Sequence, residues 1–160
     1  MKLLSFPLAA AFAAVLSLTA CGGGGGDAGS GNGGLSNATI KIASETVGTG
    51  TATAATGNRV LVNYTGWLYS TTATATGNKG TQFDTSAVRG PYELIVGGNV
   101  IPGFSQAVQG MKVGGKRTVV IPAVLGYGSA GTQGIPPNSD LVFDVELLKI
   151  CATAVLNTAC

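Results

Sequence analysis

The sequence predicts one α+β domain, in which an antiparallel sheet packs one face against a single short helix. Three observations predict this fold. The chain has 160 residues, which is enough for one domain. Several short segments alternate apolar and polar residues as strands do, whereas only one segment repeats apolar residues with the period of a helix. Because so short a helix is unstable alone, we expect the sheet to cover its apolar face.

The expected helix lies within NVIPGFSQAVQGMKVGGK, residues 99–116. Pro102 suits the first helical position, because its fixed φ matches a helix and its missing N–H needs no partner there. Apolar side chains then recur at intervals of three and four residues, at Phe104, Ala107, Val108 and Met111. This spacing places them on one face of the helix. The glycines that start at Gly110 end it.

Six segments are expected to form strands. They lie at residues 40–42, 59–69, 82–86, 91–96, 116–122 and 140–150. The clearest is 59–69, where Val60, Val62 and Tyr64 share one face and polar residues share the other. The segment 140–150 alternates in the same way. The sheet should therefore have one apolar face and one polar face.

Two connections between these strands are long. After Ser70 comes TTATATGNKGT, a polar insertion with turn residues. The second, LGYGSAGTQGIPPNSD at residues 125–140, is punctuated by glycine, and its length makes it a candidate functional loop. Tyr127 is its most informative residue, because packing alone explains an aromatic side chain on such a loop poorly.

Composition excludes several classes of function. Charged residues make up 10% of the chain and the net charge is +2, which argues against an electrostatic nucleic-acid surface. We therefore expect no nucleic-acid partner. The chain has no histidine, which removes Ser/His/Asp and Cys/His catalysis as well as His-ligated zinc sites.

Residues 1–20 have the features of a secretory signal, with Lys2 followed by an apolar run. The residues LTAC at 18–21 resemble the lipobox of bacterial lipoproteins, in which the cysteine becomes the lipidated first residue. Residues 21–37 would then form a Gly-rich tether from lipidated Cys21 to a domain at 38–150. A plain signal peptide with an incidental cysteine is the alternative.

Acyl chains on Cys21 would anchor the protein to a bacterial membrane without a spanning helix. Gly22, and not aspartate, follows the cysteine, which in enteric-type sorting would permit the outer membrane. The expected location is therefore the outer membrane, facing the periplasm or the cell surface.

The remaining cysteines, Cys151 and Cys160, lie in the C-terminal tail at residues 151–160. An exported protein meets an oxidising compartment, so a disulfide between them is the leading hypothesis. Two free thiols on a frayed tail remain the alternative.

Six segments together resemble the FKBP-type peptidyl-prolyl isomerases. They are VNYTGWL (62–68), QFDTS (82–86), VIPGF (100–104), GYG (126–128), GIPPNS (134–139) and LVFDVELLKI (141–150). They occur in the family's order, and the resemblance covers residues 47–150. It implies a half-open antiparallel β-sheet wrapped around one short α-helix, with the active site in the hydrophobic pocket between them. It also implies isomerisation of Xaa-Pro bonds without a metal or another cofactor.

The same resemblance implies the site residues. Catalytic roles fall on Asp84, Tyr127 and Phe83, and substrate-binding roles on Tyr64, Arg89, Tyr92, Val100, Ile101, Phe104 and Phe143. Arg89 would pair with Asp84, while the Tyr127 hydroxyl and the Ile101 N–H would bind carbonyl oxygens. Phe104 would form the floor, a position that is usually tryptophan in the family. Without the resemblance, the sheet aromatics Tyr64, Phe83 and Phe143 are better explained as core residues than as pocket residues.

The resulting prediction is a membrane-anchored isomerase that assists the folding of exported proteins. Its expected partners are proline-containing polypeptides and, by resemblance, FK506-like macrolides. Two other functions stay open: a module that holds proline-containing or unfolded chains without turnover, and a lipoprotein that serves only as an interaction scaffold. The insertion after Ser70 lengthens a hairpin enough to overhang the site, which would suit a binder, whereas Asp84 and Tyr127 favour the enzyme.

Overall fold

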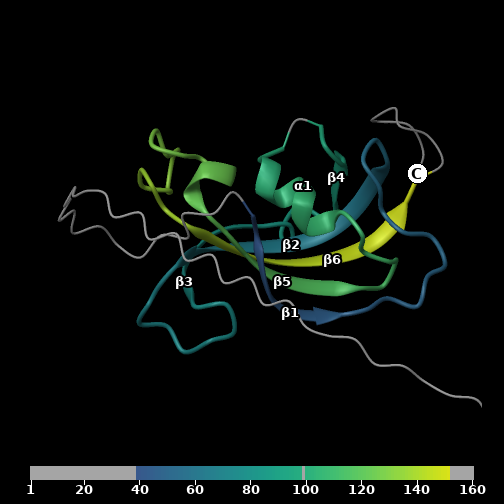
Figure 1. The fold of residues 1–160 in the computed structure, drawn as a ribbon, viewed down its shortest axis with the longest axis horizontal. Helices are drawn as coiled ribbons and strands as arrows, with labels where there is room; N and C mark the ends of the chain where they lie inside the picture. The colour runs from purple at the N-terminus through teal and green to yellow at the C-terminus, as the bar shows by residue number, and fades with distance from the viewer. Residues whose placement is uncertain (1–38, 99, 152–160) are drawn as a thin grey trace, which may run out of the picture. The chain divides into compact units, whose positions relative to one another are not determined.

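The computed structural model describes residues 39–98 and 100–151, which form one six-stranded sheet with one short α-helix (Figure 1). The strands and helices are β1 (Lys41–Thr46), β2 (Arg59–Tyr69), β3 (Lys79–Thr85), β4 (Tyr92–Ile95), α1 (Pro102–Val108), β5 (Lys116–Ile121), the 3-10 turn η1 (Ala123–Leu125) and β6 (Leu141–Ile150). Every strand pair is antiparallel. The α+β class expected from the sequence is confirmed.

The strands lie in the order β1-β5-β6-β2-β3, with β4 also paired to β2. β2 pairs with β6 along one edge. Along its other edge, the first half of β2 pairs with β4 and the second half pairs with β3. β3 and β4 therefore lie end to end beside β2, and the segment at residues 86–91 connects them where the edge is interrupted.

The helix α1 lies over one face of the sheet (Figure 1). Phe104, Ala107 and Val108 are buried there against strand residues such as Val60 and Val62. These are the apolar positions that the sequence assigned to the helix.

Met111, expected on the same helical face, lies beyond the helix, which ends at Val108. Gly110 has φ of +80°, a left-handed backbone that turns the chain before another helical turn can form. Met111 is nevertheless buried in the core. The apolar spacing thus predicted its burial correctly and its secondary structure wrongly.

Strand β2 has the predicted bounds, whereas β1 and β3 differ from expectation. β1 extends to Thr46 and most of its residues are exposed, since it is an edge strand that pairs only with β5. Such a strand lacks the apolar alternation by which strands are recognised. β3 begins at Lys79, which pairs with Tyr69 across the hairpin, so part of the expected insertion belongs to the sheet.

The hairpin tip between β2 and β3 packs on the sheet face opposite α1. A β-carbon added at Gly77 would meet side-chain carbons of Val142 and Thr118 at 2.9 and 3.0 Å. Both residues lie on the face away from the helix, which was expected to be polar. Val142 and its cross-strand partner Val120 are nevertheless buried there. The expectation that this insertion overhangs the pocket is therefore wrong, because its tip covers a small apolar patch behind the sheet.

Arg117 joins α1 to the sheet. At the N-terminus of the helix, the N-cap residue Ile101 makes no side-chain capping hydrogen bond. The buried Arg117 guanidinium donates from Nη1 to the carbonyl oxygens of Ala107 (2.7 Å) and Gln109 (3.1 Å), and from Nη2 to Glu45 on β1 (2.5 Å). It thus satisfies carbonyls at the helix C-terminus that would otherwise lack partners.

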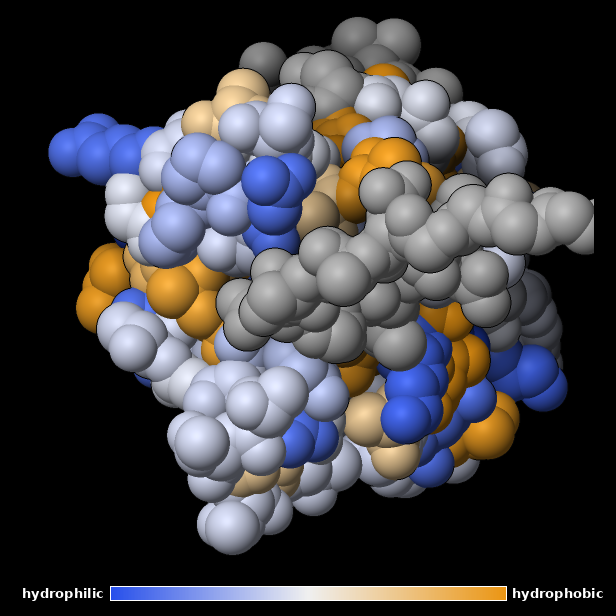
Figure 2. Space-filling model, turned by 60° about the vertical axis from the view of Figure 1, so that its left-hand side comes forward, coloured by the Kyte–Doolittle hydropathy of each residue, from blue (hydrophilic) through white to orange (hydrophobic). Residues whose placement is uncertain are grey.

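Charge is sparse on the surface. On the face drawn in Figure 2, strongly hydrophilic residues form separate patches between pale, weakly polar areas and apolar ones. Among residues 39–98 and 100–151, no helix is long and apolar enough to cross a membrane. In the same part of the chain, no group of three or more histidine, cysteine, aspartate or glutamate residues could hold a metal ion.

We expect Arg117→Met to lower the free energy of unfolding by about 2–4 kcal/mol, because the helix carbonyls and Glu45 lose a buried charged partner. Urea denaturation followed by circular dichroism measures this loss. Lys116→Met is the matched control: its exposed ion pair with Glu146, at 3.4 Å, should contribute less than about 1 kcal/mol. Equal losses in the two variants would contradict the role of Arg117.

Candidate active site

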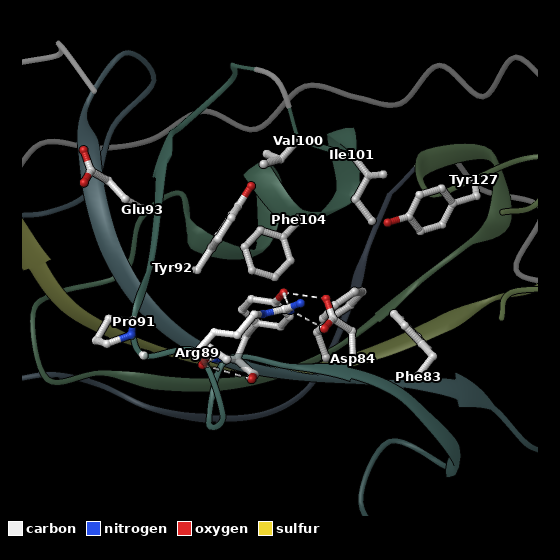
Figure 3. Close-up of a pocket in the computed structure, with 14 residues that line it drawn as sticks. Phe83, Asp84, Arg89, Pro91, Tyr92, Glu93, Val100, Ile101, Phe104 and Tyr127 are labelled. Atoms are coloured by element: carbon white, nitrogen blue, oxygen red, sulfur yellow. Dashed lines mark hydrogen bonds and ion pairs between the residues drawn. The ribbon is translucent and has the colours of Figure 1, made fainter. Parts of the chain in front are cut away.

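A pocket of about 740 Å³ opens between α1, the concave face of the sheet and the loop after η1. Its lining consists of Tyr64, Phe83, Asp84, Ser86, Arg89, Gly90, Pro91, Tyr92, Glu93, Val100, Ile101, Phe104, Tyr127 and Phe143. All the catalytic and substrate-binding residues expected from the sequence lie in this lining. Figure 3 shows most of them facing a common space.

Sequence reasoning missed four of the lining residues: Ser86, Gly90, Pro91 and Glu93. Three belong to the segment that connects β3 and β4, and they border the pocket only because those strands lie end to end beside β2. Glu93 lies on β4, where its carboxylate accepts a hydrogen bond from Arg59 Nη1 at 2.6 Å. No pattern in the sequence marks this ion pair.

Aromatic rings form the apolar part of the pocket. The Phe104 ring lies edge-on to Tyr64 and Phe143, with centroids 5.6 and 5.2 Å apart. Phe83 meets Phe143 edge-on at 5.6 Å. Edge-to-face contacts of this kind favour one relative orientation of the rings. The buried Phe104 and Phe143 thus give the pocket a floor and a back wall of defined shape.

Gly66 on β2 makes this ring arrangement sterically possible. A β-carbon there would lie 2.7 Å from a Phe83 ring carbon and 2.8 Å from a Phe143 ring carbon. Such distances are too short, so any larger residue would push the two rings apart. Gly66 lies within the YTG motif, but only the packing shows why it must be glycine.

Asp84 is held by three hydrogen bonds. Its Oδ2 accepts from the Tyr64 hydroxyl at 2.6 Å, and its Oδ1 accepts from the Thr85 N–H at 2.8 Å and from Arg89 Nη2 at 2.5 Å. The expected Asp84–Arg89 pair is thus present, although the Arg89 side chain is 64% exposed. Figure 3 shows the two side chains facing each other at the edge of the pocket.

These contacts set the protonation states. Partial burial alone would raise the pKa of Asp84, but the hydrogen bonds from Tyr64, Thr85 and Arg89 and the charge of Arg89 outweigh burial and lower it. Burial, followed by the hydrogen bond to Asp84 and the Asp84 charge, raises the pKa of Tyr64 to about 12. At neutral pH Asp84 is therefore a carboxylate and Tyr64 a neutral donor.

Tyr127 comes from the loop after η1 and reaches the pocket from another side. Hydrogen bonds from the Gly128 N–H to the Ala123 carbonyl (2.8 Å) and from the Asn138 N–H to the Gly128 carbonyl (2.8 Å) hold this loop. The Tyr127 hydroxyl points into the pocket in Figure 3 and has no hydrogen-bond partner within the described chain. Burial, then the charge of Asp84, raises its pKa, so it remains a donor.

Ile101 offers a second free donor. It precedes α1, and its carbonyl oxygen accepts from the Phe104 N–H at 3.0 Å. Its own N–H has no hydrogen-bond partner in residues 39–98 and 100–151. The arrangement therefore combines apolar rings, a carboxylate that already accepts three hydrogen bonds and two donors that lack a partner within residues 39–98 and 100–151. It suits a ligand with an apolar ring and carbonyl acceptors.

Comparison with known proteins decides the family. The sequence model of the FKBP-type peptidyl-prolyl cis-trans isomerases matches residues 50–148. The chain belongs to this family. FK506-binding protein 1 of Gibberella zeae is 49% identical over 96 residues, which cover 59% of this chain and 83% of that protein. The FK506-binding protein of Neisseria meningitidis serogroup A is 44% identical over 97 residues, which cover 59% of this chain and 81% of that protein.

A solved structure supports the FKBP fold. The crystal structure of FkpA from Escherichia coli superposes with a TM-score of 0.57 at 41% identity, covering 69% of this chain and 46% of that chain. The FKBP-like sheet wrapped around one short helix, implied by the six motifs, is therefore confirmed. In sequence, FkpA is 48% identical over 92 residues, which are 57% of this chain and 30% of FkpA.

The expectations for the two ends of the chain concern residues outside the described ranges. The signal at residues 1–20, the tether at 21–37 and the lipidated Cys21 all lie there, as does Cys160. Cys151 is described: it is buried, and its sulfur takes part in a disulfide. Its pairing with Cys160 stays a prediction.

We expect the Asp84 carboxyl to titrate below its ordinary range, and Tyr64→Phe to move its pKa upward because one donor to the carboxylate is lost. Since the pKa is lower in the folded state, the carboxylate stabilises the fold above the unfolded-state value of about 3.9. That contribution is lost as the pH falls through the folded-state value. Carboxyl carbon NMR measures both effects. An Asp84 pKa that Tyr64→Phe leaves unchanged would contradict the assignment, and Tyr69→Phe, outside the pocket, serves as the control.

Proposed function

We propose that this pocket isomerises Xaa-Pro bonds in exported proteins. The observation that carries the proposal is a box of aromatic rings next to two donors, the Tyr127 hydroxyl and the Ile101 N–H, which have no partner in the described part of the chain. The chain's family supports the reaction class. The export of its clients is our own extension from the N-terminal sequence.

The reaction needs no nucleophile. Rotation about a peptide bond is opposed by amide resonance, with a barrier of about 18–20 kcal/mol. Uncatalysed exchange at Xaa-Pro takes tens to hundreds of seconds. The planar amide is more dipolar than the twisted one, so an apolar pocket disfavours the ground state relative to the twisted state. Each difference of about 1.4 kcal/mol between these states corresponds to a tenfold change in rate.

The polar groups of the pocket orient the substrate. In this proposal the proline ring enters the box formed by Tyr64, Phe104 and Phe143, and the Ile101 N–H binds a carbonyl oxygen. The Tyr127 hydroxyl binds a second carbonyl. Asp84 accepts three hydrogen bonds already, so it acts by holding Tyr64 and Arg89 in place and by polarising the rim.

A Leu-Pro or Phe-Pro test peptide should undergo faster cis-to-trans conversion when this protein is added. Tyr127→Phe should lower kcat/KM by about 3- to 10-fold, the usual cost of one hydrogen bond. Asp84→Leu should lower it further, because Tyr64 and Arg89 lose their common acceptor. Protease-coupled or NMR exchange measurements give these rates.

Tyr69→Phe, outside the pocket lining, is the control for the loss of a tyrosine hydroxyl. Unchanged turnover in both folded pocket variants would defeat the assignment of Tyr127 and Asp84. No acceleration by the folded wild-type protein would favour a module that holds proline-containing chains, with Phe104 at the floor as the first residue to examine.

We also propose that FK506-like macrolides enter the same pocket. The matched relatives from Gibberella zeae and Neisseria meningitidis are named as FK506-binding proteins. Phe104 at the floor presents a smaller ring than tryptophan, which deepens the pocket and changes its contact with a bound macrolide.

Membrane attachment is a separate proposal that depends on Cys21. It is supported by the lipobox-like residues 18–21 and by the Gly-rich residues that follow. In bacteria that make the full chain, labelled palmitate should enter the protein, and Cys21→Ser should abolish both the label and the membrane fraction. Cys160→Ser should keep both. Recovery of unlabelled wild-type protein in the soluble fraction would refute the anchor.

A further inference from the structure

Three tyrosines line the pocket, and their hydroxyl groups are in different states. The Tyr64 hydroxyl donates to Asp84 at 2.6 Å and is therefore not available to a substrate. The hydroxyls of Tyr127 and Tyr92 have no hydrogen-bond partner within residues 39–98 and 100–151. The Tyr127 hydroxyl already has a role in the proposed mechanism, whereas the Tyr92 hydroxyl has none.

The Tyr92 ring is well held although its hydroxyl is free. Tyr92 is the first residue of β4 and pairs with Val62 of β2. Its ring lies edge-on to Tyr64, with centroids 5.7 Å apart and planes at 78°. The residue is 42% exposed. The backbone and one face of the ring are thus fixed, and the hydroxyl lies where a substrate could reach it.

The Tyr92 hydroxyl points toward the N-terminal end of α1. In Figure 3 it points away from the Asp84–Arg89 pair and toward Val100, while Tyr127 approaches from the loop on the other side of Phe104. The pocket mouth therefore has two tyrosine hydroxyls that come from different elements. The free N–H of Ile101 belongs to the segment between them.

A peptide that contains proline is bound best by a pocket that offers it hydrogen-bond donors. Proline has no N–H, so the backbone around an Xaa-Pro bond is rich in acceptors and poor in donors. The residue before proline is extended, which turns successive carbonyl groups to opposite sides of the chain. Asp84, the carboxylate in the pocket, already accepts three hydrogen bonds. The hydroxyls of Tyr92 and Tyr127 and the N–H of Ile101 are the donors that the pocket offers to such a chain.

We infer that the Tyr92 hydroxyl donates a hydrogen bond to a backbone carbonyl of the substrate outside the isomerising Xaa-Pro bond. This inference rests on the proposed isomerase function and adds a third anchor to Ile101 and Tyr127. Three hydrogen-bond donors at separate points of the pocket opening can bind a peptide longer than the Xaa-Pro dipeptide. Tyr92 is thus a residue that determines how strongly flanking segments of the client contribute to binding.

The direct test is Tyr92→Phe, which removes one oxygen and keeps the ring against Tyr64. For an Ala-Leu-Pro-Phe peptide we expect kcat/KM to fall by about 3- to 10-fold, mostly through KM, because the bond is made to ground state and transition state alike. For a minimal blocked Leu-Pro substrate the loss should be less than about twofold. Tyr69→Phe, which removes a hydroxyl outside the pocket, should change neither substrate.

An ester scan identifies the acceptor. In each of a series of peptides, one amide outside the Leu-Pro bond is replaced by an ester, whose carbonyl is a weaker acceptor. The penalty for Tyr92→Phe should shrink in one of these peptides and persist in the others. An equal penalty in every ester peptide would show that the variant acts through the ring position, and no penalty in any peptide would overturn the inference.

Calorimetric binding of the same peptides separates this inference from the proposed function. If the wild-type protein binds the peptide without accelerating its isomerisation, the enzyme proposal fails and the Tyr92 hydrogen bond is judged from Kd alone. A Kd that rises by about 3- to 10-fold in Tyr92→Phe supports the bond, and an unchanged Kd refutes it. Urea denaturation of the variant checks that its stability is that of the wild type.

Discussion

The contact between Arg117 and the end of α1 holds the rest of the site in place. A helix of seven residues cannot persist alone in water. Burial of Phe104, Ala107 and Val108 holds its apolar face, and Arg117 satisfies the carbonyls that its short length leaves without partners. Glu45 on the edge strand β1 neutralises the buried guanidinium. Ile101 and Phe104, at the start of this helix, therefore have fixed positions relative to the sheet.

The pocket opens where the edge of the sheet is interrupted between β3 and β4. β3 and β4 share one edge of β2, and the chain between them leaves the sheet at residues 86–91. Asp84 lies just before this interruption, Arg89 lies within it and Tyr92 lies just after it. A continuous edge strand would have filled the same space with paired backbone. The pocket thus depends on a break in strand pairing as much as on its aromatic side chains.

The electrostatics of the pocket suit a reaction in which no bond is broken. Asp84 accepts hydrogen bonds from Tyr64, Thr85 and Arg89, and its pKa is lowered. The pKa values of Tyr64 and Tyr127 are raised, so both remain neutral donors. Such a site offers orientation and an apolar surface, with no strong base or nucleophile. This agrees with catalysis by preferential binding of a twisted amide.

Local patterns in the sequence determined a large part of this protein. Alternation and helical spacing predicted β2, β6 and the burial of the α1 face, because side-chain direction follows from backbone period. The motifs around Tyr64, Asp84, Ile101 and Tyr127 predicted residues that do line one pocket. Only the tertiary structure decided that the hairpin tip near Gly77 lies behind the sheet, that Arg117 holds the helix end and that the Tyr92 ring lies edge-on to Tyr64 in the pocket lining. Each of these depends on which distant strands become neighbours, and that information is absent from any single stretch of the chain.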